Sequence, residues 1–415
     1  MNVPKLRFKE FSGEWIPVSL HDYFDFIDGD RGKNYPSEND FFKEGHCLFL
    51  NANNLTEIGF SFKETNWISK EKHESLRKGI VQQHDLVLTS RGSRLGKLAL
   101  FNEINSYPFV RINSAMLIIR AKNKIDVPYS LHLFKEKILP IFIAEKKVGS
   151  AQPHITVKDL KKVKSFMPIE IHEQQKISTF VDILNKKIQL QQQKIDLLQE
   201  QKKGHMQKLF KQELRFKDED GKDYPKWEET KFGKAVRIKR GLTYKPSDVC
   251  DKGVRVLRSS NILENIFLLK KDDVFVKPEA IKIDFVKNND ILITAANGSS
   301  RLVGKHALIK GLDEKTVHGG FMLIATAEEP EFINALMDSA WYKKFINVHV
   351  SGGNGSIGNL SKSDLEEQIV YLPSLKEQKK IGEFFEVYDR KIQLEQHKIE
   401  VLQKQKQGFM QQMFI

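Results

Sequence analysis

Basic, amide and hydroxyl side chains cluster in a loop that follows a buried strand-like run in each half of the chain. The run LVLTS (86–90) leads into RGSRLGK, and ILITA (291–295) leads into ANGSSRLVGK. Arginine and lysine bind phosphates, and arginine, asparagine and serine also bind base edges. The candidate nucleic-acid contacts here are Arg91, Ser93, Arg94, Lys97, Asn297, Ser299, Ser300, Arg301 and Lys305. Two basic turns that simply face solvent are the alternative.

Two more pairs of matching stretches place further candidates at strand ends. The segment HDYFDFIDGDRGKNYP (21–36) matches KFGKAVRIKRGLTYKP (231–246), and CLFLNANNLTEIGF (47–60) matches VLRSSNILENIF (256–267). Each is a strand-like stretch that ends in glycine or in polar residues. The side chains expected to reach a ligand from these loops are Arg31, Lys33, Asn51, Asn53, Asn54, Arg240, Lys245, Arg258, Ser259 and Asn261.

The charge balance favours a polyanionic partner. Lysine and arginine number 67 and aspartate and glutamate 54, which gives a formal net charge of +13 and a pI of about 9.3. A field of this sign attracts nucleic acid. A basic surface that is merely solvated is the alternative, since a high pI is common.

Motifs of enzymes that act on nucleic acids are absent or incomplete. The chain has no N-P-P-[YF] methyltransferase motif, and His172-Glu173 lacks the second histidine of H-E-x-x-H. Residues 92–97 resemble a P-loop but are one residue short, and Gly353-x-Gly355-x-x-Gly358 matches the dinucleotide pattern without a following βαβ unit. We therefore expect no catalytic residues and no metal site, and a self-contained enzyme with an unrecognised site is a competing hypothesis.

Length and composition indicate a folded chain of two or three domains. The 415 residues are 40% hydrophobic, which is enough for sizeable cores. No run approaches eighteen apolar residues, so we expect a cytoplasmic protein that does not enter a membrane. Cys47 and Cys250 are too few for a disulfide framework or a metal cluster, and we expect them to behave as small apolar side chains.

Two long stretches, Glu173–Phe210 and Glu377–Phe414, repeat one another with a constant offset of 204. Apolar residues alternate steps of four and three, interrupted at Gln191 and Glu395, which predicts coiled-coil helices. The expected seam is Ile177, Leu184, Ile188, Ile195 and Leu198 in the first copy and Ile381, Tyr388, Ile392, Ile399 and Leu402 in the second. The alternatives are two helices packed locally, or a coiled-coil scaffold that binds no nucleic acid.

Side chains outside this seam and the helix starts add two further expectations. Leu190, Leu197 and Met206 lie off the seam, which suggests that partner helices or the globular parts cover them. Ser374 and Glu377 match the S-x-x-E capping box that often begins a helix.

The whole chain reads as one plan used twice. LRFKEFSGEW (6–15) returns as LRFKDEDGKDYPKW (214–227), and each half has strand-like stretches followed by amphipathic helices near 127–143 and 330–346. This order predicts an α+β fold with two similar mixed domains and a pseudo-two-fold internal repeat. The predicted division is 1–170 and 214–372 for the domains, with helical segments at 171–213 and 373–415.

The duplicated preludes HITVKDLKKVKSFMPIEIHEQQKI (154–177) and IGNLSKSDLEEQIVYLPSLKEQKKI (357–381), each followed by KIQL, resemble a known family. The chain resembles the specificity subunit of Type I restriction-modification systems over essentially its full length. The resemblance implies two target recognition domains separated by two antiparallel coiled-coil helices, each domain reading one half of an interrupted double-stranded DNA sequence. Because the loop residues differ between halves, the full target should be asymmetric.

The resemblance also implies partners. Two methyltransferase (M) subunits would supply S-adenosylmethionine, and endonuclease or translocase (R) subunits would supply ATP and magnesium. The chain itself would bind no cofactor and perform no catalysis, and it would direct methylation and cleavage by the other subunits.

Overall fold

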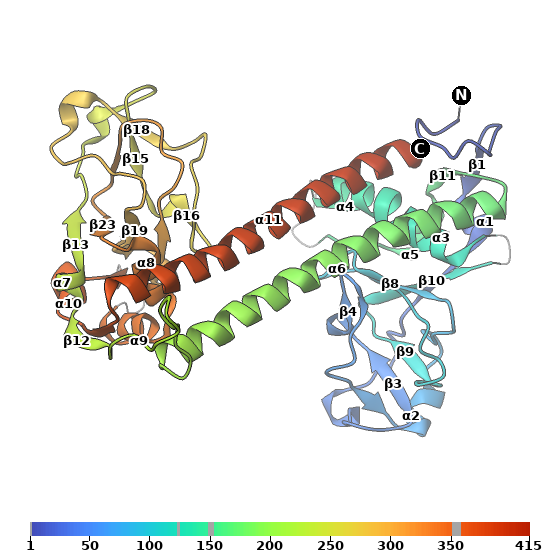
Figure 1. Cartoon of the computed structure of the whole chain (residues 1–415). Helices are drawn as coiled ribbons and strands as arrows, with labels where there is room; N and C mark the ends of the chain where they lie inside the picture. Colours follow the sequence, from blue (N-terminus) through green and yellow to red (C-terminus); the bar gives the residue numbers. More distant parts are fainter. Residues whose placement is uncertain (1, 123–124, 148–152, 351–357) are drawn as a thin grey trace. The chain divides into compact units, whose positions relative to one another are not determined.

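The structure is a computed structural model that describes residues 2–122, 125–147, 153–350 and 358–415 (Figure 1). The chain folds as two compact units: unit 1 comprises Met1–Gln191 with Lys398–Ile415, and unit 2 comprises Gln192–His397. Each unit therefore contains part of both long helices. The four-segment division made from the sequence stays a prediction. Gly353 and Gly355 of the dinucleotide pattern lie outside the described residues.

A four-stranded antiparallel sheet forms the centre of unit 1, in the order β2-β10-β7-β8. Its strands are β2 (Phe24–Asp28), β7 (Leu86–Thr89), β8 (Leu98–Leu100) and β10 (Met116–Ala121). Leu86 and Leu88 face a core shared with helices, and Val87 faces a second core shared with a smaller sheet. Successive side chains of a strand point to opposite faces, so coverage of both faces explains why LVLT is apolar throughout.

Unit 2 repeats this sheet in the order β13-β23-β19-β21. Its strands are β13 (Val236–Arg240), β19 (Ile291–Thr294), β21 (His306–Leu308) and β23 (Met322–Ala327). Ile291 and Ile293 lie in the helical core, and Leu292 lies in the core on the other face. The two halves thus share both strand order and the alternation of core residues.

A smaller sheet covers the second face in each unit. In unit 1 it consists of β3 (Cys47–Leu50), β6 (Trp67–Ile68) and β9 (Val110–Ile112), with the hairpin β4 (Leu55–Thr56) and β5 (Gly59–Phe60) beside it. In unit 2 it consists of β14 (Val249–Cys250), β15 (Val254–Leu257), β18 (Val274–Val276) and β22 (Thr316–His318), with the hairpin β16 (Ile262–Leu263) and β17 (Ile266–Phe267). β3 pairs with β9, and β15 with β22, in parallel.

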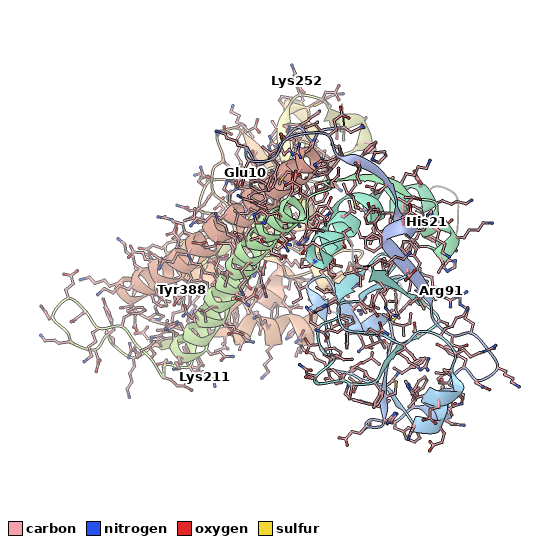
Figure 2. The ribbon with its side chains drawn as sticks, turned by 90° about the vertical axis from the view of Figure 1, so that its right-hand side faces the viewer. Glu10, His21, Arg91, Lys211, Lys252 and Tyr388 are labelled. Atoms are coloured by element: carbon pink, nitrogen blue, oxygen red, sulfur yellow. The ribbon has the colours of Figure 1, made fainter. Side chains whose placement is uncertain are left out.

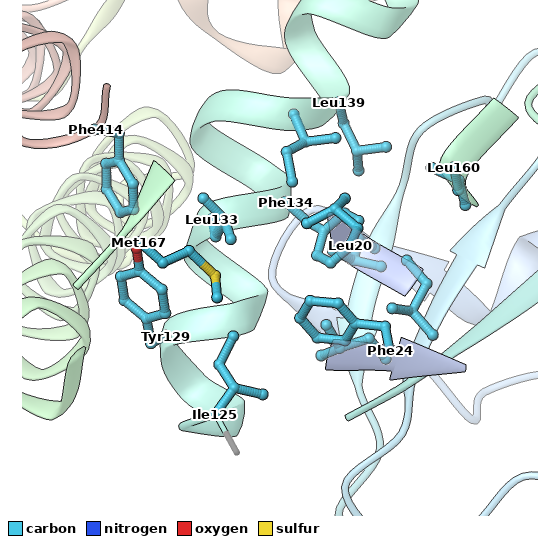
Figure 3. Close-up of a cluster of buried hydrophobic side chains, with 14 of the residues drawn as sticks. Leu20, Phe24, Ile125, Tyr129, Leu133, Phe134, Leu139, Leu160, Met167 and Phe414 are labelled. Carbon is cyan, nitrogen blue, oxygen red and sulfur yellow. The ribbon is translucent and has the colours of Figure 1, made fainter. Parts of the chain in front are cut away.

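Helices cover the other face of each large sheet. Unit 1 has α3 (Val127–His132), the π-helical turn η3 (Leu133–Ile138), α4 (Leu139–Lys147) and α5 (Val157–Lys161), and unit 2 has α8 (Pro330–Asp338), α9 (Ala340–His349) and α10 (Lys362–Glu366). Figure 3 shows the resulting core of unit 1, where the rings of Phe24 and Phe134 meet edge to face with centroids 5.2 Å apart. The helices expected near 127–143 and 330–346 are therefore present.

Short elements complete both units. Two-stranded sheets join β1 (Ile16–Ser19) to β11 (Lys164–Met167) and β12 (Glu228–Lys231) to β25 (Ile369–Leu372). The remaining helices and strands are α1 (Leu20–Tyr23), α2 (Lys70–Ser75), α7 (Phe232–Ala235), β20 (Ala296–Asn297) and β24 (Gly358–Asn359). The 3₁₀ turns are η1 (Glu38–Asp40), η2 (Ala52–Asn54), η4 (Pro246–Asp248), η5 (Ser259–Asn261), η6 (Pro278–Ala280) and η7 (Ser300–Leu302).

The two repeated stretches form the long helices α6 (Ile171–Phe210) and α11 (Leu375–Met413). Within unit 1 the start of α6 packs on the end of α11, since the rings of Phe180 and Phe409 are 5.4 Å apart. Within unit 2 the end of α6 packs on the start of α11, where the rings of Phe210 and Phe385 stack 6.1 Å apart. The helices are antiparallel in both units, which confirms the predicted fold class of two mixed domains with antiparallel long helices.

The seam between the helices is mostly apolar. Ile177, Ile195, Ile381, Ile392 and Ile399 are buried, and the seam residues that are half-buried are Leu184, Ile188, Leu198, Tyr388 and Leu402. Tyr388, labelled in Figure 2, packs against His205 of α6 with ring centroids 5.7 Å apart. The interruption at Glu395 has a physical reason, because this buried carboxylate pairs with Lys194 at 2.9 Å.

An ion pair holds the start of each long helix. Arg7 donates from Nε and Nη2 to Glu173 at 2.8 Å each, and Arg215 donates likewise to Glu377 at 3.2 and 2.7 Å. Both glutamates are buried. The capping box predicted at Ser374 is wrong, because the Ser374 hydroxyl has no hydrogen-bond partner among the described residues and Glu377 binds Arg215 instead.

Candidate nucleic-acid interface

Four loops of unit 2 surround a pocket of about 580 Å³. They follow β13, β15, β19 and β22, so they meet at the ends of strands from both sheets. The predicted contacts Arg258, Ser259 and Asn297 line this pocket. Its other lining residues are Leu242, Thr243, Tyr244, Ala296, Gly298, Gly319, Gly320, Phe321 and Met322. The structure thus brings together three residues that were predicted from separate segments.

The loops approach closely because glycine occupies the contact. A Cβ atom on Gly241 would lie 2.0 Å from the carbonyl oxygen of Gly319, a distance that no side chain tolerates. Unit 1 has the same contact, where a Cβ on Gly29 would lie 2.2 Å from the carbonyl oxygen of Asn113. The two equivalent glycines therefore allow the loop after β2 or β13 to lie close to the loop after β9 or β22.

The Asn297 amide is fixed in place by two hydrogen bonds. Its Nδ2 donates to Ser259 Oγ at 3.0 Å, and its Oδ1 accepts from the backbone N–H of Ser299 at 2.9 Å. A primary amide has two N–H donors and two acceptor lone pairs. Within the described part of the chain, one donor and one acceptor of this amide remain for a ligand, and this is the combination that recognises the N6 and N7 edge of adenine.

Two of the predicted contacts are structural instead. Asn54 and Asn261 are 1% and 0% exposed. Asn54 donates to the carbonyls of Ser61 and Glu64 and accepts from the backbone N–H of Asn51. Asn261 donates to Leu268 and Asp273 and accepts from the N–H of Arg258. These buried amides shape the two loops, so their assignment as DNA contacts is corrected.

In unit 1 the corresponding loop directs its cations inward. Arg91, labelled in Figure 2, donates from Nη2 to the Ser114 carbonyl at 2.5 Å and to its hydroxyl at 2.9 Å. Arg94 donates to the carbonyls of Ala52 and Leu55 at 3.4 and 3.3 Å. Lys97 pairs with Glu57 at 3.1 Å. These cations therefore connect the loop after β7 to neighbouring loops of unit 1. Among the four predicted contacts in this loop, only Ser93 is exposed.

The other predicted contacts lie nearer the surface. Asn51 accepts from the N–H of Asn53 at 2.8 Å, and Arg31 pairs with Asp28 at 3.1 Å. The exposed members are Arg31, Lys33, Asn53, Arg240, Lys245, Arg258, Ser300 and Arg301, and the half-buried ones are Asn51, Ser259, Asn297, Ser299 and Lys305. Arg301 has no ion pair or hydrogen bond from its side chain within the described part of the chain, which leaves its guanidinium open to a phosphate.

The surroundings of two histidines near these loops lower their pKa values. Partial burial, followed by the charges of Arg31 and Arg91, lowers the pKa of His154. Burial lowers the pKa of His318 to about 4. His318 comes directly before the Gly319 loop, and its Nε2 lies 3.3 Å from the Lys239 carbonyl oxygen. Both rings are therefore neutral near pH 7, and the positive potential of the loops comes from arginine and lysine.

Neither a metal cluster nor a membrane helix is found in the described residues. No group of three or more histidine, cysteine, aspartate or glutamate side chains is placed to hold a metal ion across 2–122, 125–147, 153–350 and 358–415. In the same ranges, no helix is both long enough and apolar enough to span a membrane.

Comparison with known families agrees with the internal duplication. The family model of the Type I restriction modification DNA specificity domain matches residues 12–200 and again residues 224–404. The chain belongs to this family. Each specificity domain match contains one large sheet, its smaller sheet and most of one long helix.

Relatives of similar length match nearly the whole chain. The MjaVIII specificity subunit of a Type I restriction enzyme from Methanocaldococcus jannaschii is 25% identical, over 97% of this chain and 94% of the relative. A putative MjaX specificity subunit of the same organism is 26% identical, over 99% of this chain and 95% of the relative.

Solved structures show the same fold. The S subunit of a Type I restriction-modification system from M. genitalium superposes with a TM-score of 0.60 at 15% identity, covering 100% of this chain and 99% of that one. A second solved chain comes from a structure that addresses complex assembly and conformational transition of the type I R-M system. It superposes with a TM-score of 0.57 at 14% identity, covering 95% of this chain and 96% of that one.

The two specificity domains of this chain differ where the loops meet. The second contains the pocket with Asn297, whereas the first has Arg91 bonded to Ser114. Sequence reasoning missed one residue of the second domain, Phe321, which is 68% exposed at the pocket. The segment HGGFMLIATA reads as a strand, and only the paired glycines before Phe321 signalled a turn.

Proposed function

We propose that this chain is the DNA specificity subunit of a Type I restriction-modification complex. It reads an asymmetric, two-part DNA sequence and directs methylation and cleavage by partner subunits. The observation that supports this most is the presence of two specificity domains with one frame and different loop residues. Because the two domains share one fold, they present their loops in the same way. Loops with different residues then select different bases.

Affinity for DNA comes from the basic side chains. A net charge of +13 and the exposed Arg240, Lys245, Arg258 and Arg301 suit phosphate contacts that strengthen at low salt. Base selection falls to the few groups with fixed geometry, of which Asn297 is the best placed. The remaining predicted contacts at the protein surface extend this interface in both units.

Both long helices carry an exposed apolar stripe that suits partner subunits. Ile183, Leu190 and Leu197 recur every seven residues along α6 and are 61%, 51% and 54% exposed. The equivalent stripe on α11 is Val387, Leu394 and Val401, at 49%, 54% and 39%. A heptad-spaced stripe fits another helix. Two equivalent stripes favour two methyltransferase subunits, each with a helix that packs on one of them.

Chemistry belongs to the partners in this proposal. The methyltransferase subunits bind S-adenosylmethionine, and the endonuclease or translocase subunits bind ATP and magnesium. The chain itself binds no cofactor and acts without catalytic residues, in the cytoplasm. A self-contained DNA-modifying enzyme and a coiled-coil scaffold are less favoured, since neither requires two specificity domains.

The deciding experiment is methylation sequencing of DNA from cells that express the methyltransferase subunit with and without this chain. We expect one interrupted, asymmetric sequence to be methylated only when the chain is present. A chimaera in which residues 1–170 come from another family member should change one half of that sequence and keep the other. Methylation without the chain, or a change in both halves, would contradict the proposal.

A further inference from the structure

Phe321 is a large apolar residue that is mostly exposed and lies outside the hydrophobic core clusters of unit 2. Its side chain is 68% exposed on the turn between β22 and β23, and it lines the pocket with Tyr244 and Asn297. The next residue, Met322, is 1% exposed and belongs to the core. An aromatic ring presented in this way is available to a ligand, as are the large aromatic anchors of many interfaces.

Backbone hydrogen bonds hold the turn that presents Phe321. The Phe321 carbonyl oxygen accepts hydrogen bonds from the backbone N–H groups of Ala295 and Ala296 at 2.9 and 3.0 Å. The Gly319 carbonyl beside it lies against Gly241. The backbone that carries the ring is therefore held against the large sheet and against the loop after β13. A backbone held in this way presents the ring at a defined place beside the pocket.

Unit 1 has the same turn without the ring. Ala115 occupies the equivalent place, because its carbonyl oxygen accepts from Ser90 at 2.8 Å as that of Phe321 does from Ala295. Register supports this equivalence, since Leu50 pairs with Ile112 and Leu257 with His318 in the two parallel ladders. The aromatic side chain is therefore a difference between the two units, and the fold that they share does not require it.

The chemistry beside Phe321 identifies the group it would contact. Among the residues that the structure describes, none takes the second donor or the second acceptor of the Asn297 amide. This pair of groups suits adenine, and an A·T pair exposes the thymine 5-methyl group in the same groove. Phenylalanine contacts that methyl group in direct readout. The exposed cation Arg258, which lines the same pocket, suits a phosphate of the same strand.

We propose that Phe321 is a specificity-determining residue that contacts the 5-methyl group of a thymine in the half-site read by unit 2. The inference rests on the proposed function and deepens it, because it names the base chemistry at one position. Asn297 hydrogen-bonds a neighbouring or paired adenine, and Phe321 favours thymine over cytosine, which lacks the methyl group. At the equivalent place in unit 1, Ala115 presents only a methyl group in place of the ring.

The test is a thermodynamic cycle between Phe321 and the thymine methyl group. The chain is purified in complex with its methyltransferase subunits, and the DNA duplex bears the sequence that methylation sequencing identifies. Each thymine in the half-site of unit 2 is replaced in turn by deoxyuridine, which removes only the methyl group. At one position, affinity should fall roughly fourfold, the effect of one buried methylene-sized group.

The variants F321A and F321L complete the cycle. F321A should bind the thymine duplex more weakly and should show no further loss with deoxyuridine. F321L keeps an apolar group and should retain most of the methyl effect. Deoxyuridine in the half-site of unit 1 is the matched control, and its effect should be the same in the wild-type chain and in F321A.

Several results would overturn the inference. The first is a half-site of unit 2 that contains no thymine. The second is a loss of affinity from F321A that simply adds to the loss from deoxyuridine. The third is a rise in 2-aminopurine fluorescence that depends on Phe321, which would show that the ring inserts between bases. Normal methylation combined with any of these would overturn the role of Phe321 alone. A complex that methylates no defined sequence would overturn the proposed function as well.

Discussion

Arg215 binds the buried carboxylate of Glu377 through two nitrogen atoms, at the residue where α11 enters the core of unit 2. Arg7 and Glu173 repeat the arrangement in unit 1. Removal of one member of such a pair leaves a charge buried without compensation. The pair therefore fixes each long helix to the segment that precedes the domain.

Replacement of Arg215 by alanine should lower the free energy of unfolding of unit 2 by about 3 kcal/mol. Urea unfolding followed by circular dichroism measures this change. Lys226→Ala, at an exposed position of the same segment, is the control and should change little. The double variant R215M/E377L should recover part of the loss, and unaltered stability in R215A would refute the structural role.

The apolar stripe on α6 should be needed for the methyltransferase subunit and not for folding. Leu190→Glu places a charge on the stripe, and we expect at least tenfold weaker binding of the partner, since burial of a leucine side chain contributes about 1.5–3 kcal/mol. Gln193→Glu adds the same charge at an exposed polar position and serves as the control. Titration calorimetry of both variants measures the difference, and equal affinities would argue against this surface.

Arg301 should bind a DNA phosphate. Arg301→Ala is expected to reduce the slope of log affinity against log salt by about 0.9, the value for one phosphate contact. Arg94 is the internal comparison, because it already donates to the Ala52 and Leu55 carbonyls. R94A should destabilise unit 1 and leave the slope nearly unchanged. An identical slope in wild-type protein and R301A would remove this side chain from the interface.

His318 should make unit 2 sensitive to acid. Its pKa in the folded chain is about 4, below the value of about 6.5 for a free histidine, so the unfolded chain binds more protons between these values. Stability should therefore fall by up to about 3 kcal/mol as the pH drops from about 6.5 to about 4. His318→Ile, which copies Ile112 of unit 1, should remove this contribution. Parallel pH profiles for both chains would contradict the assignment.

Duplication made the fold predictable. The constant offset between the long stretches identified α6 and α11, and the matching runs LVLT and ILIT identified the central strands. Polar side chains were harder to assign. Asn54 and Asn261 occur in polar loops, yet their amides bind backbone groups, and in Asn261 also the Asp273 carboxylate, that only the folded loop brings close. Composition cannot separate an amide that faces a ligand from one that shapes a turn.

The same difficulty affects ion pairs between distant segments. Ser374 and Glu377 fit a local capping pattern, but Arg215 satisfies the glutamate from 162 residues away. Glu395 interrupts the apolar pattern of the seam, and its partner Lys194 lies 201 residues away in the sequence. Phe321 was missed because its neighbours are core residues and a strand pattern hides an outward ring. Long-range partners decide each of these cases.

The core of unit 1 includes Met410, Met413 and Phe414, and the ring of Phe414 stacks on Tyr129 with centroids 6.0 Å apart (Figure 3). During synthesis these residues leave the ribosome only after all of Gln192–His397 has been made. The domain translated first is therefore completed last, and until then its apolar surface is open to chaperones and proteases. Unit 2 has no such delay, because every segment of it has already emerged by that time.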